Sequence, residues 1–466
     1  MGGAVVADGG DARLSRPGDS GDGGTLARRC ALRVLRDVSG GALLDRSAAR
    51  RFSELDTRDR AWAVEAAFGT TRLRGRLDAA LAPHLAGKAL DPAVRDVLRL
   101  GVYQLKEMGG VPPYAAVSES VGLARASGRG RAAGLVNAVL HRVAEADYAP
   151  PPTGSDTLTA LATWGSHPRW LLERWLARYG ADATAALVDA NNRRPELYIR
   201  LIGDGVDAAL RRLAGVGIDA ERVALEPRSL RLPAGTDLGV AFGAARAIVQ
   251  DPAASAAVRY AALPQGHSIA DLCAAPGGKS FALLDLGAGR VTPADRSRSR
   301  LRSVVDTAER LGLRGGSTGA ASAPSPAGLL GPVAADACAP PFAPGDAVLL
   351  DAPCTGTGTL RRHPDGRWRV GPADLASLAA LQARMLDAAA DAVAPGGLLI
   401  YATCSLEPEE NEEQVDRFLA DNEGFRLDPP AGSDVPVCAQ GYLRVLPQEQ
   451  GVDGSFAARL RRAASC

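Results

Sequence analysis

The chain of 466 residues has little cysteine: seven residues, an odd number, with no two of them spaced C-x-x-C. This pattern argues against a disulfide framework, a cysteine-rich zinc site and a thiol redox enzyme. We therefore expect a reducing cytoplasm as its setting and no bound metal.

Long apolar runs are also missing. No run reaches the ~18 consecutive apolar residues that a membrane-spanning helix requires. Residues 1–23 lack the basic segment followed by an apolar one that marks a secretory signal. We expect a cytoplasmic protein with no membrane partner.

Lysine is scarce as well, since only Lys88, Lys106 and Lys279 occur among 54 basic residues. A chain that otherwise uses arginine has kept Lys279 in a glycine-rich segment, which indicates that a compact ammonium matters there. The formal net charge is +1, yet residues 24–145 hold 20 basic and 12 acidic residues. This excess favours a polyanionic partner such as nucleic acid, although a solvated helical surface would also explain it.

Composition and periodicity divide the chain into a tail and three domains. Residues 1–23 are rich in Gly and Asp without an apolar period, which is typical of a disordered tail. Residues 24–147 predict an all-α domain, with a helix that starts at Asp91-Pro92 and ends at Val111–Pro113. Residues 155–243, with a helix expected over 165–185, predict a small α+β domain. Residues 245–466 alternate strands with helices, which predicts an α/β domain with a parallel sheet.

The unusual residues of the α/β domain follow its expected strands, at 269–272, 348–350 and 398–402. Ligand sites in such sheets lie at the carboxyl ends of the strands. The first strand leads into CAAPGGKS (residues 273–280), where glycines allow backbone amides to approach a ligand at the start of a helix. Asp295 follows 24 residues after Asp271, a position from which an acid commonly binds ribose hydroxyls. The pair favours an adenosine-bearing cofactor; a glycine turn with a surface aspartate is the alternative.

The second strand leads into Asp351-Ala-Pro-Cys354, which puts a carboxylate and a thiol on a pocket rim. The segment RRHPDGRWR follows at residues 361–369. Its basic groups can bind phosphates, and its aromatic ring can stack on a base. We therefore expect RNA contacts from Arg361, Arg362, Arg367 and Trp368. The alternative is a charged segment that only faces solvent.

The third strand leads into Tyr401–Ser405, which contains Cys404. A thiol at the end of a strand beside a cofactor loop is a candidate nucleophile, although a buried cysteine is usually structural. The acidic run Glu409–Glu413 behind Pro408 predicts the start of a helix, where acids suit the helix dipole.

Three segments together carry a family resemblance: DLCAAPGGKS, DAPCTGTGTLRRHPDGRW and YATCSLEPEENEEQV. They resemble the motifs of RNA cytosine-5 methyltransferases, most closely the bacterial 16S ribosomal RNA enzymes of the Sun (RsmB) type. Residues 249–255, 441–447 and 453–456 are similar to further segments of that family. The stretches LRLGVYQLKEMGGVPPYAAVSESV and GLVNAVLHRV look like the NusB-type RNA-binding domain of such enzymes. The resemblance implies that residues 24–147 are a NusB-like domain and residues 245–466 a Rossmann-like methyltransferase domain.

The resemblance also implies S-adenosyl-L-methionine as cofactor and 16S ribosomal RNA as substrate. Pro293 and Ser455 depart mildly from the family pattern, and we expect a monomer. Carried over, the cofactor contacts would be Cys273, Ala274, Ala275, Pro276, Gly277, Gly278, Lys279, Asp295, Asp336 and Asp351.

Cytosine C5 is a poor nucleophile, and a thiolate that adds to C6 can activate it. Such chemistry needs a low-pKa cysteine, an acid that contacts the edge of the cytosine, and a general base. The cytosine must also leave the base stack of the RNA. Asp351 is placed to pair with the N3/N4 edge of the cytosine, protonated or sharing a proton. Spacing does not decide which thiol attacks: DNA cytosine-5 enzymes use the Pro-Cys thiol, here Cys354. The RNA family uses the Thr-Cys-Ser thiol, which implies that Cys404 attacks and Cys354 assists release.

A transfer RNA cytosine methyltransferase and a non-catalytic RNA-binding protein are the alternative functions.

Overall fold

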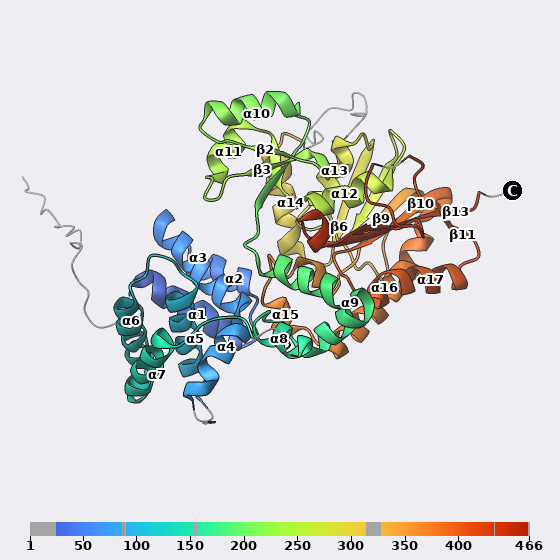
Figure 1. Ribbon diagram of the computed structural model, residues 1–466. Helices are drawn as coiled ribbons and strands as arrows, with labels where there is room; N and C mark the ends of the chain where they lie inside the picture. The colour runs from blue at the N-terminus through green and yellow to red at the C-terminus, as the bar shows by residue number, and fades with distance from the viewer. Residues whose placement is uncertain are drawn as a thin grey trace, which may run out of the picture. The chain divides into compact units, whose positions relative to one another are not determined.

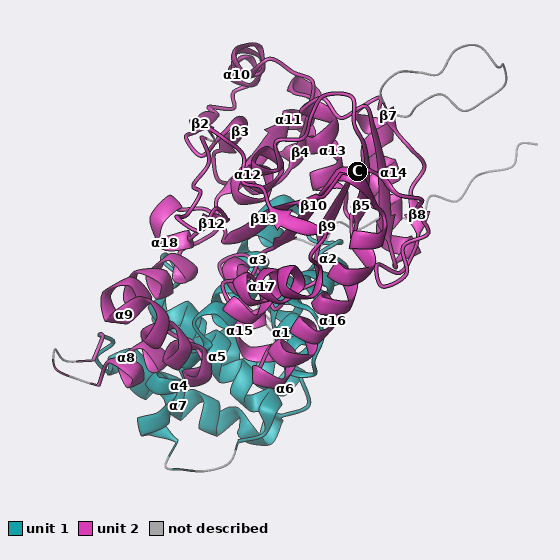
Figure 2. Cartoon of the chain, turned by 90° about the vertical axis from the view of Figure 1, so that its right-hand side faces the viewer, with its two compact units in different colours: residues 1–149 teal, residues 150–466 magenta. Residues whose placement is uncertain are grey.

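The computed structural model describes residues 25–464 except 86, 88, 89, 152, 153, 155, 314–327 and 433. It consists of two compact units, residues 1–149 and 150–466, which Figure 2 distinguishes by colour. The predicted tail, residues 1–23, lies outside the described residues.

The described part of the first unit is helical (Figure 1). Its core consists of apolar side chains at helical spacing, such as the fully buried Val97, Leu98 and Leu140. The α-helices are α1 (Leu26–Ser39), α2 (Leu44–Arg51), α3 (Thr57–Arg72), α4 (Arg74–Leu81), α5 (Pro92–Lys106), α6 (Pro113–Ala126) and α7 (Ala133–Glu145).

One predicted boundary in this unit is right and the other is wrong. The carboxylate of Asp91 caps α5 by accepting from the Ala93 amide at 2.8 Å. The helix does not reach Val111–Pro113 but ends at Lys106, and Pro113 is the first residue of α6. A proline suits that position because the first amide of a helix has no partner to lose.

The second unit begins with α8 (Thr157–Thr163) and α9 (Arg169–Asn192). The single helix predicted over 165–185 is therefore wrong in extent. The longer α9 bends at Gly180, whose φ of +78° is not helical.

A four-stranded antiparallel sheet follows, in the order β2-β3-β1-β4. It packs against two helices through fully buried residues that include Ile199, Leu213 and Leu230. The elements are β1 (Leu197–Leu201), α10 (Val206–Gly215), β2 (Glu221–Val223), β3 (Glu226–Leu232), α11 (Leu238–Ala244) and β4 (Ala247–Val249). This confirms the small α+β domain.

The rest of the unit is a large sheet with the order β11-β13-β10-β9-β5-β6-β7. Its strands are β5 (Ser268–Leu272), β6 (Arg290–Asp295), β7 (Gly328–Leu329), β8 (Val333–Ala334), β9 (Gly345–Asp351), β10 (Val393–Thr403), β11 (Phe425–Leu427), β12 (Leu443–Val445) and β13 (Ser455–Arg462). Its helices are α12 (Pro252–Ala261), α13 (Gly278–Asp285), α14 (Arg298–Arg310), α15 (Gly366–Arg369), α16 (Pro372–Asp391), α17 (Glu412–Asp421) and α18 (Pro447–Gln450).

The centre of this sheet is parallel, as predicted, because β5, β6, β9 and β10 pair in the same direction. The strands are continuously apolar because both faces are buried: Leu349 belongs to the core on one face, while Val348 and Leu350 belong to the core on the other. The antiparallel β13 beside β10 makes the sheet mixed, which the strand pattern does not predict.

Candidate active site

Four strand ends meet at one edge of the large sheet. Leu272 pairs with Ala294 and Leu350, and Asp351 pairs with Ala402. Residues that follow β5, β6, β9 and β10 therefore gather at one edge. All the predicted catalytic and cofactor residues end these strands or follow them, except Asp336, which follows β8.

The glycine loop after β5 has a strained and crowded backbone. Cys273 lies in the left-handed region at φ +62°, and Gly277 at φ +105°. A β-carbon on Gly277 would lie 2.8 Å from a ring carbon of Phe281 and 3.3 Å from both methyl groups of Val304. Only glycine fits there. Gly277 is also the N-cap of α13 and offers no capping side chain, so the first amides of α13 are left for a ligand.

Two of the predicted acids differ in their surroundings. Asp295 is buried at the end of β6, and it accepts from the amides of Ala275 at 3.3 Å and Ser297 at 2.8 Å. It thereby joins the glycine loop to the next strand. Asp336 is exposed and accepts from the Cys338 amide at 2.9 Å. It lies two residues beyond β8, which pairs with the end of β6.

A third carboxylate, Asp271, lies beneath the loop. It is fully buried and accepts from the Ser280 hydroxyl, and its other oxygen has no partner within the described structure. Burial raises the pKa of Asp271 to about 7. The free amides of α13 suit an anionic group, and the Asp295 carboxylate suits hydroxyls. Together these groups fit an adenosyl amino acid.

In the part of the chain that is described, no three His, Cys, Asp or Glu side chains could together hold a metal ion.

Lys279 connects the glycine loop to the end of β9. Its Nζ lies 2.7 Å from Oδ2 of Asp351. Burial acts to lower the pKa of Lys279, but the acidic groups around it, Asp351 first among them, together raise it. The ammonium therefore stays charged at the centre of the site.

The two thiols singled out by the sequence meet here. Sγ of Cys354 lies 3.4 Å from Sγ of Cys404. A hydrogen bond from Cys354 lowers the pKa of the Cys404 thiol, and the Lys279 charge acts in the same direction against burial and Asp351. The same hydrogen bond raises the pKa of Cys354, as does burial. The geometry therefore favours a thiolate on Cys404 and a thiol on Cys354.

The backbone around Cys404 is held by a close glycine contact. The Gly358 amide donates to the Cys404 carbonyl at 2.9 Å, and the Gly454 amide donates to the Gly358 carbonyl at 2.7 Å. A β-carbon on Gly358 would lie 2.7 Å from the Cys404 oxygen and 2.8 Å from Cα of Gly454. Three loops can approach this closely only because glycine occupies position 358.

Glu410 positions the Cys354 loop, and sequence reasoning missed it. The buried carboxylate accepts from the Thr355 amide at 2.8 Å and from Gln382 Nε2 at 3.0 Å, while the same Nε2 donates to the Pro353 carbonyl at 2.9 Å. Burial raises the pKa of Glu410, and these hydrogen bonds oppose the shift. The acidic run around Glu410 predicts only a helix start. A short helix does begin there, and α17 follows from Glu412.

Helix α9 holds the loop that follows Cys404. Arg174 forms ion pairs with Glu407 at 2.7 Å and with Glu409 at 2.6 Å. Arg178 donates to the Leu406 carbonyl at 2.7 Å. The helix therefore fixes the chain only a few residues beyond the nucleophile candidate.

The arginines expected to contact RNA have protein partners instead. Arg367 is 1% exposed, and its guanidinium donates to Asn192 Oδ1 at 2.8 Å and to three backbone carbonyls. Arg362 donates to Asp453 at 2.7 Å and is paired with Asp251. Arg361 is buried and donates to the Gly451 carbonyl at 3.0 Å. The guanidinium groups of these three arginines donate to acceptors within the protein and so fix loops around the site. The fourth predicted RNA contact, Trp368, is half-buried.

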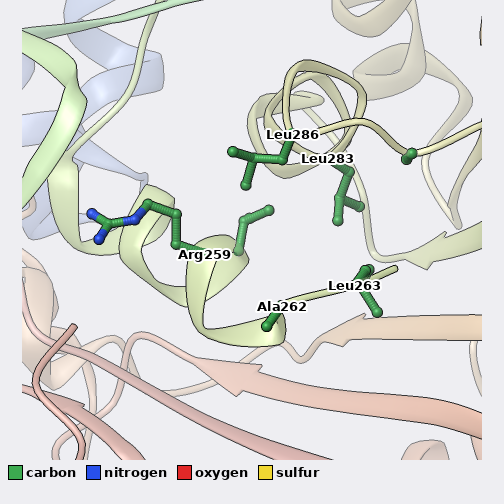
Figure 3. A pocket seen from close by; sticks show the side chains of 7 residues that line it. Arg259, Ala262, Leu263, Leu283 and Leu286 are labelled. Carbon is green, nitrogen blue, oxygen red and sulfur yellow. The ribbon is translucent and has the colours of Figure 1, made fainter. Parts of the chain in front are cut away.

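An apolar pocket of about 200 Å³ lies away from this edge (Figure 3). Leu283 of α13, Leu286 directly after that helix, and Leu263 line it, at the opposite end of α13 from the glycine loop. Its one charged side chain, Arg259, donates to the Leu225 carbonyl at 2.9 Å and pairs with Glu226. The pocket therefore offers no reactive group.

Comparison with solved structures shows the fold. The crystal structure of PH0851 matches with a TM-score of 0.77 and 23% identity, over 94% of this chain and 98% of that one. The crystal structure of a methyltransferase homolog protein from Pyrococcus horikoshii matches with a TM-score of 0.53 and 23% identity, over 66% of this chain and 99% of that one. With the glycine loop, acid and thiols at one sheet edge, this fold defines the class: a Rossmann-like α/β protein with a ligand site at the carboxyl ends of its parallel strands.

Sequence comparison gives the family. The family model described as 16S rRNA methyltransferase RsmB/F matches residues 260–461, the NusB family matches 25–145, and the RsmF/B-like ferredoxin-like domain matches 167–238. Ribosomal RNA small subunit methyltransferase B of Pseudomonas putida is 35% identical over 94% of this chain and 99% of that relative. Its counterpart in Sodalis glossinidius is 35% identical over 93% and 96%. The chain belongs to the RsmB/F family of 16S rRNA methyltransferases, and it is an RNA methyltransferase. None of the helices in the described ranges is both long and apolar enough to cross a bilayer.

Proposed function

We propose that this chain methylates C5 of a cytosine in 16S ribosomal RNA through a covalent bond between Cys404 and C6. One observation supports the proposal above all. The Cys404 sulfur, whose pKa is lowered, lies 3.4 Å from the Cys354 sulfur at the sheet edge that carries the glycine loop. A thiolate beside a cofactor loop is what addition to a pyrimidine requires.

The cofactor of this reaction, S-adenosyl-L-methionine, supplies an electrophilic methyl group when bound. We assign its contacts to residues 273–279, Asp295, Asp336 and Asp351. The free amides of α13 would bind the carboxylate of the amino-acid part. Asp295, fixed by two backbone amides, would accept from ribose hydroxyls.

Cys404 begins the chemistry. Its thiolate adds to C6 of the flipped cytosine and forms an S–C6 bond, so that the electron pair of the C5–C6 double bond becomes available at C5. C5 would then form a bond to the methyl carbon as the bond from that carbon to the sulfonium sulfur breaks, and the electron pair of the broken bond would stay on that sulfur. Asp351, held at 2.7 Å by Lys279, accepts a hydrogen bond from the N4 amino group and orients the ring.

Release reverses the addition. A base removes the C5 proton, the electron pair of that bond restores the C5–C6 double bond, and the S–C6 bond breaks. The leaving thiolate returns to Cys404. There the Cys354 thiol, which has a raised pKa and so keeps its proton, donates a hydrogen bond that stabilises the departing charge.

The RNA would contact both units. The NusB family match covers the basic segment, residues 25–145. In the second unit, three arginines just beyond β6 are exposed and lack a carboxylate partner in the described structure: Arg296, Arg298 and Arg302. Arg296 directly follows Asp295, and Arg298 and Arg302 lie in the first two turns of α14, so these charges lie near the end of β6.

A direct test uses purified protein, methyl-labelled S-adenosylmethionine and naked 16S RNA, with transfer RNA as the competing substrate. We expect label in 16S RNA, and bisulfite sequencing should place it on C5 of a cytosine. Label only in transfer RNA would replace the substrate, and label at another atom would overturn the cytosine C5 chemistry.

A further inference from the structure

Gln250 is a buried amide that the reaction described above does not use. It lies between β4 and α12 and is 8% exposed. Its backbone amide donates to the Tyr198 carbonyl at 3.3 Å. The buried Ser255 hydroxyl donates to its Oε1 at 2.8 Å. Because Ser255 occupies the oxygen, the NH₂ group points to the opposite side.

That opposite side is the start of α13. A β-carbon built on Gly278 would lie 2.9 Å from Nε2 of Gln250. Gly278 is not in the left-handed region, so its backbone alone would tolerate a side chain. The Gln250 amide is therefore what excludes one, and its Nε2 has no acceptor among the residues that the structure describes.

Donors of two kinds thus lie close together at the start of α13. The first amides of α13 have no side-chain cap, and the Gln250 NH₂ lies beside them. A helix N-terminus together with a fixed amide donor suits a carboxylate. Gln250 is neutral, so it adds donors there without adding a charge of its own.

We propose that Gln250 is a binding residue for the methionyl carboxylate of the cofactor, oriented by Ser255. The inference rests on the proposed function, because it requires an S-adenosyl amino acid at the glycine loop. If Gln250 only packs α12 against α13, its loss would weaken every adenosine ligand alike.

The test compares two ligands on the full chain by calorimetry. S-adenosylhomocysteine carries the carboxylate, whereas 5′-methylthioadenosine lacks the amino-acid part. Gln250→Leu should weaken S-adenosylhomocysteine about tenfold or more, the usual effect of losing a hydrogen bond to a charged group. Affinity for 5′-methylthioadenosine should stay within twofold. Gln250→Glu, which keeps the shape but repels a carboxylate, should show the same selectivity and stands in if the leucine variant fails to fold.

The matched control is Gln265→Leu. Gln265 is exposed beyond the other end of α13, where it donates to the Leu286 carbonyl at 3.4 Å. This variant should bind both ligands like the wild type. Equal weakening of both ligands in Gln250→Leu, or no weakening at all, overturns the carboxylate contact. A wild-type chain that binds neither ligand would instead refute the proposed function.

Discussion

Two sulfur atoms 3.4 Å apart on half-buried side chains strongly disfavour a negative charge on both. The first proton to leave creates an anion that the remaining S–H stabilises, so the second thiol keeps its proton. The hydrogen bond from Cys354 is the main cause that lowers the pKa of Cys404, and the Lys279 charge adds to it, whereas the nearby Glu410 raises the pKa of Cys354. The asymmetry between the two cysteines thus arises from their neighbours, although each follows a strand in a similar way.

The asymmetry predicts opposite phenotypes for the two alanine variants. Cys404→Ala should abolish methyl transfer and form no adduct, because no sulfur adds to C6. Cys354→Ala should accumulate a covalent protein–RNA adduct, because the departing thiolate loses its hydrogen-bond donor. Denaturing gels of the protein incubated with RNA and cofactor would show the adduct as a shifted band. Residual methylation by Cys404→Ala together with no adduct from Cys354→Ala would reverse or refute the assignment.

Replacing Lys279 should change the acidity of the nucleophile. Its ammonium lowers the pKa of Cys404, so Lys279→Met should raise that pKa. Since the thiolate is the reactive form, the rate of Cys404 alkylation by iodoacetamide should rise with pH over a higher range than in the wild type. Lys106→Met is the control, because Lys106 donates to the carbonyls of Ala144 and Ala146 in the first unit. An unchanged pH profile in Lys279→Met would exclude the charge effect.

At this scale the sequence predicts strand-end residues better than it predicts their partners. Cys273, Asp295, Asp351, Cys354 and Cys404 lie at one edge because parallel strands end together. The burial of Arg367 was not predicted, because three of its four acceptors come from residues 166, 191 and 192, far back in the chain, which no local pattern reveals. Glu410 was missed for the same reason.

The elements around the site are joined by close backbone contacts. At Gly358 the chain touches the Cys404 carbonyl and the Gly454 backbone, so the loop after β9 supports the end of β10. Apolar runs in the sequence predict the spacing of the strands. They do not predict these loop contacts, since the contacts depend on distances between segments about 50 residues apart or more.

Gly358→Ala should therefore damage both stability and catalysis. The added methyl group would meet the Cys404 oxygen at 2.7 Å and must push the two loops apart. We expect a loss of ~1–3 kcal/mol in the free energy of unfolding, with a lower kcat because the sulfur moves. Denaturant unfolding and single-turnover methylation would measure these effects.

Gly243→Ala provides the matched control. Gly243 lies in α11 of the same unit, and a β-carbon there would meet nothing within 4 Å. Alanine should stabilise that helix by ~0.5–1 kcal/mol and leave kcat unchanged. If both variants behave alike, the contact at Gly358 does not support Cys404.

Helix α14 begins with exposed positive charge beside the site. Arg298 and Arg302 are four residues apart and so share one face of the helix, and Arg296 precedes it. Replacing any of the three by alanine should raise KM for RNA and reduce the log–log salt slope of binding by about 0.7–0.9 for each phosphate that is no longer neutralised. Filter binding across a salt series would measure the slope. Arg290→Ala, exposed at the amino end of β6 on the far edge of the sheet, should change neither value. Equal effects at Arg290 would mean that the charge acts nonspecifically.

The whole molecule is nearly neutral, with a formal net charge of +1, so its affinity for RNA must come from local concentrations of charge. Residues 24–145 hold 20 basic and 12 acidic residues, and they fall within the first compact unit, which matches the NusB family. The alternation of helix and strand patterns predicts the order of the three folded parts. Sequence periodicity could not predict that the small α+β domain and the sheet form one compact unit, because the interactions that join them are long-range.

This division predicts that the second unit binds the cofactor and catalyses methyl transfer, while the first unit adds affinity for the RNA. A chain reduced to residues 150–466 retains the whole site, so it should bind S-adenosylhomocysteine with unchanged affinity and methylate RNA with a similar kcat. Its KM for 16S RNA should rise about tenfold or more and its salt slope should become shallower, since phosphate contacts supply a large share of the affinity for nucleic acid. Calorimetry verifies the site, and initial rates at several salt concentrations give KM and slope. A truncated chain with an intact site and an unchanged KM would show that the first unit does not bind the substrate.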